Sequence, residues 1–80
     1  MTSNEAVAAR ITELCRSRHL TFNSLANESG MPPSTLYSII CGKSSAPQIT
    51  SINTLCDGMG ISLRYFFQSS LFEGLEPEIC

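Results

Sequence analysis

Apolar residues recur at helical spacing along this chain, and no segment shows the alternation of a half-buried strand. The first such segment places four apolar side chains on one helical face, at positions i, i+4, i+7 and i+8: Val7, Ile11, Leu14 and Cys15. This spacing predicts a helix from about residue 4 to residue 18. Thr2, with Glu5 three residues later, fits a capping box at its start, although Ser3 competes as the cap.

A short second helix that ends in a glycine turn is predicted next. Thr21 suits its N-cap, where a side-chain oxygen accepts hydrogen bonds from the first free backbone N–H groups. Leu25 and Ala26 are its predicted buried residues, and Gly30 suits the left-handed residue at which a helix ends. Met31 is expected to point inward from this turn.

A third helix is predicted to begin at Pro33 and to end at Gly42. Proline suits the first helical position because its missing N–H would have no helical partner there. The apolar face of this helix is formed by Leu36, Ile39 and Ile40. Its remaining side chains are expected to face elsewhere: Ser34, Thr35, Tyr37 and Ser38.

The last two predicted helices follow a loop of serine, alanine and proline. The fourth helix has five apolar residues at helical spacing: Ile49, Ile52, Leu55, Cys56 and Met59. It closes at Gly60, and Gly58 is expected to weaken its last turn by about 1 kcal/mol relative to alanine. Ser62 suits the N-cap of a short fifth helix that contains Phe66.

Length and composition limit the class of protein. With 80 residues, of which 42% are hydrophobic, the chain is expected to form one domain around one modest core. Its longest apolar runs are far shorter than the roughly 20 residues that a membrane-spanning helix needs, so no membrane partner is predicted. Residues 1–20 contain no apolar core of a signal peptide, so a cytoplasmic location is predicted.

The sequence contains no recognisable catalytic set or metal site. His19 is the single histidine, and the cysteines at positions 15, 41, 56 and 80 form no Cys-x-x-Cys pair. We therefore expect no enzyme, no catalytic or metal-ligating residue, no cofactor and no small-molecule substrate. Reduced thiols are expected, and a redox or metal sensor that uses them is a remaining alternative.

Net charge differs between the two halves of the chain. The whole chain has a net charge of −2, which is the wrong sign for a typical nucleic-acid binder. Residues 1–43 carry four basic and three acidic side chains, whereas residues 44–80 carry one and four. Attraction to an anion must therefore come from the first half, where the available cations are Arg10, Arg16, Arg18 and Lys43.

Residues 21–42, a short helix, a glycine turn and a second short helix, form a helix-turn-helix pattern. With this unit at its centre, the segment 11–67 resembles the lambda-repressor-like (XRE-type) helix-turn-helix domain. Four features carry the resemblance: Leu25-Ala26 followed by Gly30, Ser34-Thr35-Leu36, Gly42-Lys43, and Pro47 before a helix that ends in Gly60-Ile61-Ser62-Leu63. The resemblance implies an all-α, compact five-helix bundle that binds double-stranded DNA through its third helix, usually as a two-fold dimer.

The family's DNA surface, carried over to this chain, gives eight candidate DNA-binding residues: Thr21, Phe22, Pro33, Ser34, Tyr37, Ser38, Lys43 and Ser44. None of them makes the bidentate contacts of arginine with guanine or glutamine with adenine, and Pro33 offers only apolar contact, for example to a thymine methyl group. Phe22 stands where the family usually has a DNA-contacting glutamine. Cys15 and Ile40 stand where the family often pairs arginine with glutamate, so this swap leaves no charge unpaired.

Four of the candidates also have a purely structural interpretation. Tyr37 can close the core against a neighbouring helix, and Phe22 can contact Val7 or Tyr37. Ser34 and its neighbour Thr35 can satisfy N–H groups at the start of the third helix. Lys43 can be a solvated charge at a helix C-terminus, where the helix dipole favours it.

The sequence thus predicts a helix-turn-helix DNA-binding domain over residues 1–68 and an acidic tail over residues 69–80 that docks or dimerises. The predicted homodimer contacts are Phe67, Leu71 and Phe72. Our hypothesis is a sequence-specific transcriptional regulator, a small repressor, that inserts its third helix in the major groove. The alternative is a protein-interaction module that retains the fold with little DNA affinity, since the third helix contains no lysine or arginine.

Overall fold

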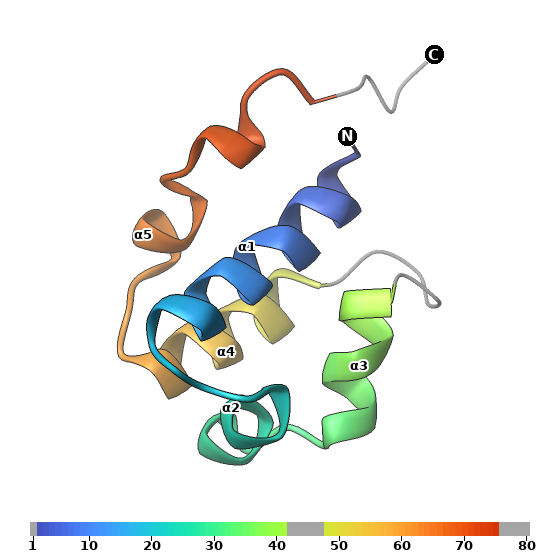
Figure 1. Ribbon diagram of the computed structural model, residues 1–80, viewed down its shortest axis with the longest axis vertical. Helices are drawn as coiled ribbons and strands as arrows, with labels where there is room; N and C mark the ends of the chain where they lie inside the picture. The colour runs from blue at the N-terminus through green and yellow to red at the C-terminus, as the bar shows by residue number, and fades with distance from the viewer. Residues whose placement is uncertain (1, 42–47, 76–80) are drawn as a thin grey trace.

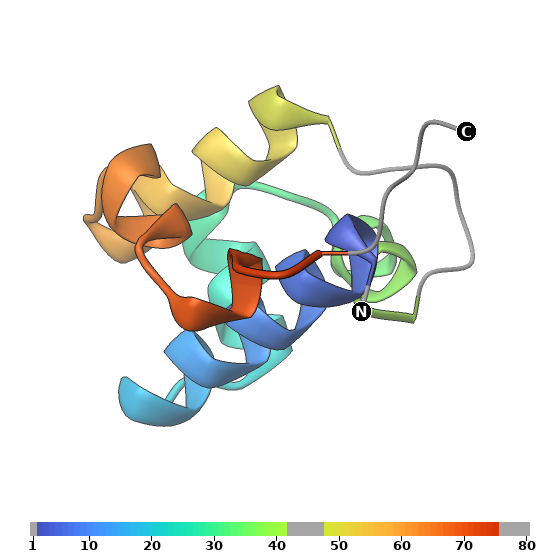
Figure 2. The same cartoon turned by 90° about the horizontal axis from the view of Figure 1, so that it is seen from above.

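The computed structural model describes residues 2–41 and 48–75. Within these ranges the chain forms five α-helices and one 3-10 turn, with no strand: α1 (Ser3–Ser17), α2 (Phe22–Ser29), α3 (Pro33–Cys41), α4 (Ile49–Met59), α5 (Leu63–Phe67) and η1 (Ser70–Phe72). α3 and α5 lie on opposite sides of the molecule in both views (Figures 1 and 2). The predicted all-α, five-helix architecture is confirmed, and no helix in the described ranges is long and apolar enough to cross a membrane.

Side-chain caps begin three of the helices at the predicted residues. The Oγ of Thr21 accepts from the N–H of Ser24 at 3.1 Å, and the Oγ of Ser62 accepts from the N–H of Tyr65. Thr2 forms the predicted capping box with Glu5, whose carboxylate accepts from the Thr2 N–H at 2.9 Å. These hydrogen bonds from Thr2 lower the pKa of Glu5. The start of α1 is thus capped by the residues that the sequence predicts.

Left-handed residues end α2 and α4 where the sequence predicts them. Gly30 has a φ of 71° and Gly60 a φ of 69°, and both are C-caps. His19, in the turn between α1 and α2, also has a positive φ of 57°, which is uncommon for a residue with a side chain. No motif in the sequence predicts the left-handed conformation of His19.

The core draws side chains from all five helices, and its largest fully buried side chains are Phe66, Ile11, Leu25, Leu36, Leu55 and Cys56. Met31 is 8% exposed, which confirms that it points inward from the turn. Ile49 shares the helical spacing of the apolar residues of α4, but its side chain is 57% exposed at the start of that helix. Ile40, predicted on the apolar face of α3, is half-buried and packs against the edge of the core.

Gly58 lies where α4 crosses α2. A Cβ atom at this position would stand 2.1 Å from the Oγ and 3.0 Å from the Cα of Ser29. The hydroxyl of Ser29 is itself buried and has no hydrogen-bond partner in the described part of the chain. Close approach of the two helices therefore explains a glycine that helix propensity alone disfavours.

We expect Gly58→Ala to lower the free energy of unfolding by about 2 kcal/mol, because the added methyl group must push α2 and α4 apart. Urea unfolding followed by circular dichroism measures this change. In the matched background Ser29→Ala the nearest clashing atom is gone, so we expect Gly58→Ala to cost less than about 1 kcal/mol there. An equal loss in both backgrounds would contradict the close contact as its cause.

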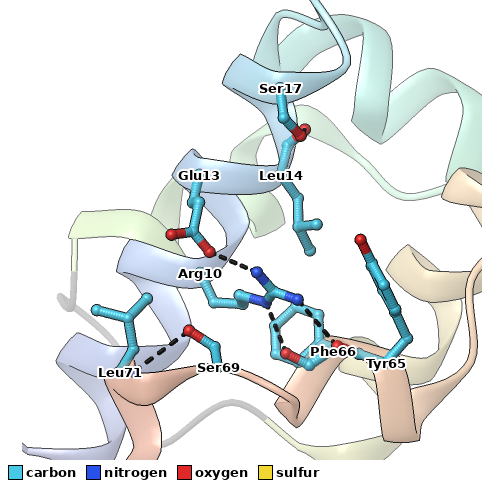
Figure 3. Close-up of polar contacts among 8 residues, drawn as sticks. All are labelled: Arg10, Glu13, Leu14, Ser17, Tyr65, Phe66, Ser69 and Leu71. Carbon is cyan, nitrogen blue, oxygen red and sulfur yellow. Dashed lines mark hydrogen bonds and ion pairs between the residues drawn. The ribbon is translucent and has the colours of Figure 1, made fainter.

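Arg10 joins α1 to α5 (Figure 3). Its Nε donates to the carbonyl of Phe66 at 2.7 Å and its Nη2 to the carbonyl of Tyr65 at 2.9 Å. Its Nη1 pairs with Glu13, and the guanidinium lies 5.4 Å from the centroid of the Tyr65 ring. The prediction that Arg10 is available to an anion was therefore wrong, since this side chain is 8% exposed and hydrogen-bonded within the protein.

The first part of the tail packs on the domain. The turn η1 contacts α1, and the ring of Phe72 lies 4.9 Å from that of Phe67 and 6.1 Å from that of Phe66, measured between centroids. Leu71 and Phe72 are half-buried, whereas Phe67 is 37% exposed. Residues 70–72 thus cover one end of the core, and their role in a dimer stays a prediction.

Candidate nucleic-acid interface

The helices α2 and α3 are held at a fixed angle by the turn between them. The N–H of Met31 donates to the carbonyl of Ala26 at 2.9 Å across the left-handed Gly30. Leu25 and Leu36 have no exposed surface, so each helix is anchored by a side chain within the core. The outer side of α3 is consequently presented as a rigid surface at one end of the molecule (Figure 1).

We call the six predicted DNA-binding residues that the structure describes the recognition face: Thr21 and Phe22 at the start of α2, and Pro33, Ser34, Tyr37 and Ser38 on α3. All of them are exposed except Phe22 and Ser38, which are half-buried. The rings of Phe22 and Tyr37 meet edge to face, with 5.9 Å between centroids and an interplanar angle of 86°. The structural interpretation of Phe22 as a contact of Tyr37 is thereby confirmed, while Tyr37 is still 43% exposed.

The hydroxyl groups of the recognition face differ in how free they are. Thr21 uses its hydroxyl as the cap of α2 and as a donor to the Oγ of Ser24. Ser38 donates to the carbonyl of Ser34 at 3.0 Å, so its oxygen can only accept from a partner. The hydroxyls of Ser34 and Tyr37 make no hydrogen bond to any residue described by the structure. These two groups are available to an external donor or acceptor.

Two other candidates, Lys43 and Ser44, lie outside the described residues, as do Gly42 and Pro47.

Among the described residues, Arg16 and Arg18 are the basic side chains nearest in sequence to the recognition face. α2 and α3 carry a single charged residue, Glu28. Arg18 donates to the carbonyl of Met59 at 3.2 Å and so caps α4. Arg16 is exposed, and its side chain has no hydrogen bond or ion pair within the described part of the chain.

Arg16 lines an open groove of about 430 Å³ together with three of the predicted residues, Thr21, Phe22 and Tyr37. The rest of the lining comes from α1 and the turn after it: Thr12, Cys15 and Leu20. Arg16 is not among the eight candidate DNA-binding residues that the family resemblance implies. Its position near the C-terminal end of α1, directly before the helix-turn-helix, was the available signal. Of the three arginines predicted as available to an anion, Arg16 is the one whose side chain has no partner within the described part of the chain.

Cys15 and Ile40, which replace the family's charged pair, both lie in or against the apolar core. Burial raises the pKa of the Cys15 thiol. Burial, followed by the neighbouring charge of Asp57, also raises the pKa of the Cys56 thiol. Both groups are neutral at physiological pH, as expected of small hydrophobic side chains, whereas Cys41 is exposed at the end of α3.

Comparisons with known proteins agree with this geometry. The model of the Cro/C1-type HTH DNA-binding domain matches residues 10–64. The crystal structure of the prophage Lp1 protein 11 is similar to this chain, with a TM-score of 0.79 and 35% sequence identity over 86% of this chain and 91% of that one. No curated protein matches. The segment matched by the family model contains α2, α3 and α4 complete, so this chain belongs to the Cro/C1-type helix-turn-helix family of DNA-binding domains.

Proposed function

We propose that this DNA-binding protein is a sequence-specific transcriptional regulator, a small repressor, that inserts α3 in the major groove. The observation that carries the proposal is the division of α3 into two sides. Leu36 and Ile39 are buried in the core, whereas Pro33, Ser34 and Tyr37 are exposed on a rigid surface. A helix supported in this way fits the major groove, which is about 12 Å wide. We further propose a cytoplasmic site of action, which is compatible with DNA as the partner.

The proposed active form is a homodimer that joins through α5 and η1. Tyr65 is 47% and Phe67 37% exposed there, beside the half-buried Leu71 and Phe72. Covering these aromatic surfaces would stabilise a domain whose own core is small. Since α3 lies on the other side of the molecule, both recognition faces stay free in such a dimer (Figure 2).

The proposal is tested by selecting binding sites from a random duplex library and measuring affinity for them by fluorescence anisotropy. We expect site-dependent binding. The logarithm of the binding constant should fall linearly with the logarithm of salt concentration, with a slope of roughly −0.9 per neutralised phosphate. Analytical ultracentrifugation of the complex gives the number of protomers per site. Absence of site-dependent binding at low salt would favour the protein-interaction module.

Arg16→Ala is expected to reduce DNA affinity and to make the salt slope shallower by about 0.9 for each protomer bound. The reason is that Arg16 is the free cation beside the recognition face among the described residues. Arg16→Lys keeps the charge and should keep the native slope. If Arg16→Ala leaves the slope unchanged, Arg16 contacts no phosphate.

A further inference from the structure

We infer that this chain identifies its DNA site chiefly through thymine methyl groups, which it contacts with the apolar side chains of the recognition face. The inference rests on the proposed function and names the base feature that the same surface selects. Its basis is the chemistry of the side chains that α3 exposes, combined with the small number of cations around them.

The first argument is the composition of α3. From Met31 to Cys41 the chain contains no arginine, lysine, asparagine or glutamine. These are the side chains that make bidentate hydrogen bonds to the major-groove edges of guanine and adenine. Polar discrimination by α3 is left to hydroxyl groups, among which those of Ser34, Thr35 and Tyr37 have no partner among the described residues. A single hydroxyl donates or accepts, so it bonds to either kind of base edge and selects weakly.

The second argument is the apolar surface itself. Pro33 is exposed at the start of α3, and the ring of Tyr37 is exposed one turn later on the same helix. The edge-to-face contact with Phe22 fixes the Tyr37 ring, so its exposed surface is already ordered before DNA binds. Among the groups that base pairs present in the major groove, the C5-methyl of thymine is the apolar one. It is the group that these side chains can contact without leaving a polar atom unpaired.

The third argument concerns the source of affinity. Phosphate contacts usually supply much of the binding free energy. Here α2 and α3 carry no positive charge, and Arg16 is the one described cation that lines the neighbouring groove without a protein partner. A weak electrostatic contribution makes each buried methyl group a larger share of the total. Apolar contact therefore decides between sites more than it would on a strongly basic surface.

The test replaces each thymine of the selected duplex by deoxyuridine, one at a time, which removes the methyl group and keeps the base pairing. At one or two thymines in each half-site we expect affinity to fall about fourfold per methyl group, and about 16-fold when both half-sites are changed. The selected duplex with all of its thymines intact provides the reference affinity.

Two variants connect the effect to named side chains. In Tyr37→Ala, deoxyuridine at the thymine that Tyr37 contacts should no longer weaken binding. Deoxyuridine at the other thymine of the half-site should keep its fourfold effect. Pro33→Ala should give the complementary result, and it serves as the second variant if Tyr37→Ala loses the fold. Site-dependent binding that changes less than twofold at every deoxyuridine would overturn this inference and leave the proposed function intact. Absence of any site-dependent binding would overturn both.

Discussion

Replacing Arg10 by methionine is expected to lower the free energy of unfolding by about 3 kcal/mol. Methionine fills the buried volume but leaves the carbonyls of Tyr65 and Phe66 without the donors that Arg10 provides at 2.9 and 2.7 Å. Each lost hydrogen bond to a charged group is worth about 1.5 kcal/mol or more. For a domain of this size the melting temperature should fall by roughly 12–24 °C, measured by calorimetry.

Two further variants separate this effect from loss of charge. Arg64 is exposed on α5 and makes no hydrogen bond or ion pair within the described residues, so Arg64→Met should change stability by less than about 0.5 kcal/mol. Arg10→Lys keeps the charge but lacks the several N–H groups with which the guanidinium reaches both carbonyls. We expect it to lower the free energy of unfolding by an intermediate amount. A loss below about 1 kcal/mol for Arg10→Met would show that the two carbonyls find other partners.

Ser34→Glu is expected to weaken DNA binding at least about 100-fold while leaving the fold intact. Ser34 is exposed at the second position of α3, and its hydroxyl makes no bond within the described residues. A carboxylate there favours the helix, because it faces the positive end of the helix dipole. The same carboxylate would meet the negatively charged duplex, and such like-charge contact costs several kcal/mol.

The matched control is Ser34→Gln, because glutamine has nearly the same shape as glutamate and carries no charge. It should keep affinity within about tenfold of the native protein, as measured by anisotropy, with thermal unfolding recorded for both variants. Binding of Ser34→Glu within about threefold of the native protein would mean that α3 does not lie in the groove.

Most of the fold could be predicted because its signals are local. A cap such as Thr21 or Ser62 acts on a residue three positions away, and Gly30 ends its helix through its own backbone angle. Helical spacing located the buried side of α3, but it cannot tell whether another element covers a given position. Ile49 shows this, since it fits the spacing of α4 and is exposed.

The recognition face was predicted from the order of motifs, and its finer arrangement needed the three-dimensional structure. Whether Arg16 or Arg10 is free depends on partners far along the chain, such as carbonyls 55 and 56 residues away. One signal was present in the sequence: Arg10 stands three residues after Val7 and four before Leu14, at the edge of the apolar stripe of α1.

The contact of Arg10 with α5 also defines where the cooperative folding unit ends. The family model matches residues 10–64, so its last residue precedes both carbonyls that receive the guanidinium. A chain cut at that point would lose both acceptors of Arg10 together with Phe66, one of the largest fully buried side chains of the core. The autonomous unit must therefore extend through Phe66, and the rings of Phe67 and Phe72 continue it into η1. Because this closure joins segments so distant in sequence, it raises the contact order of an otherwise locally connected helical domain.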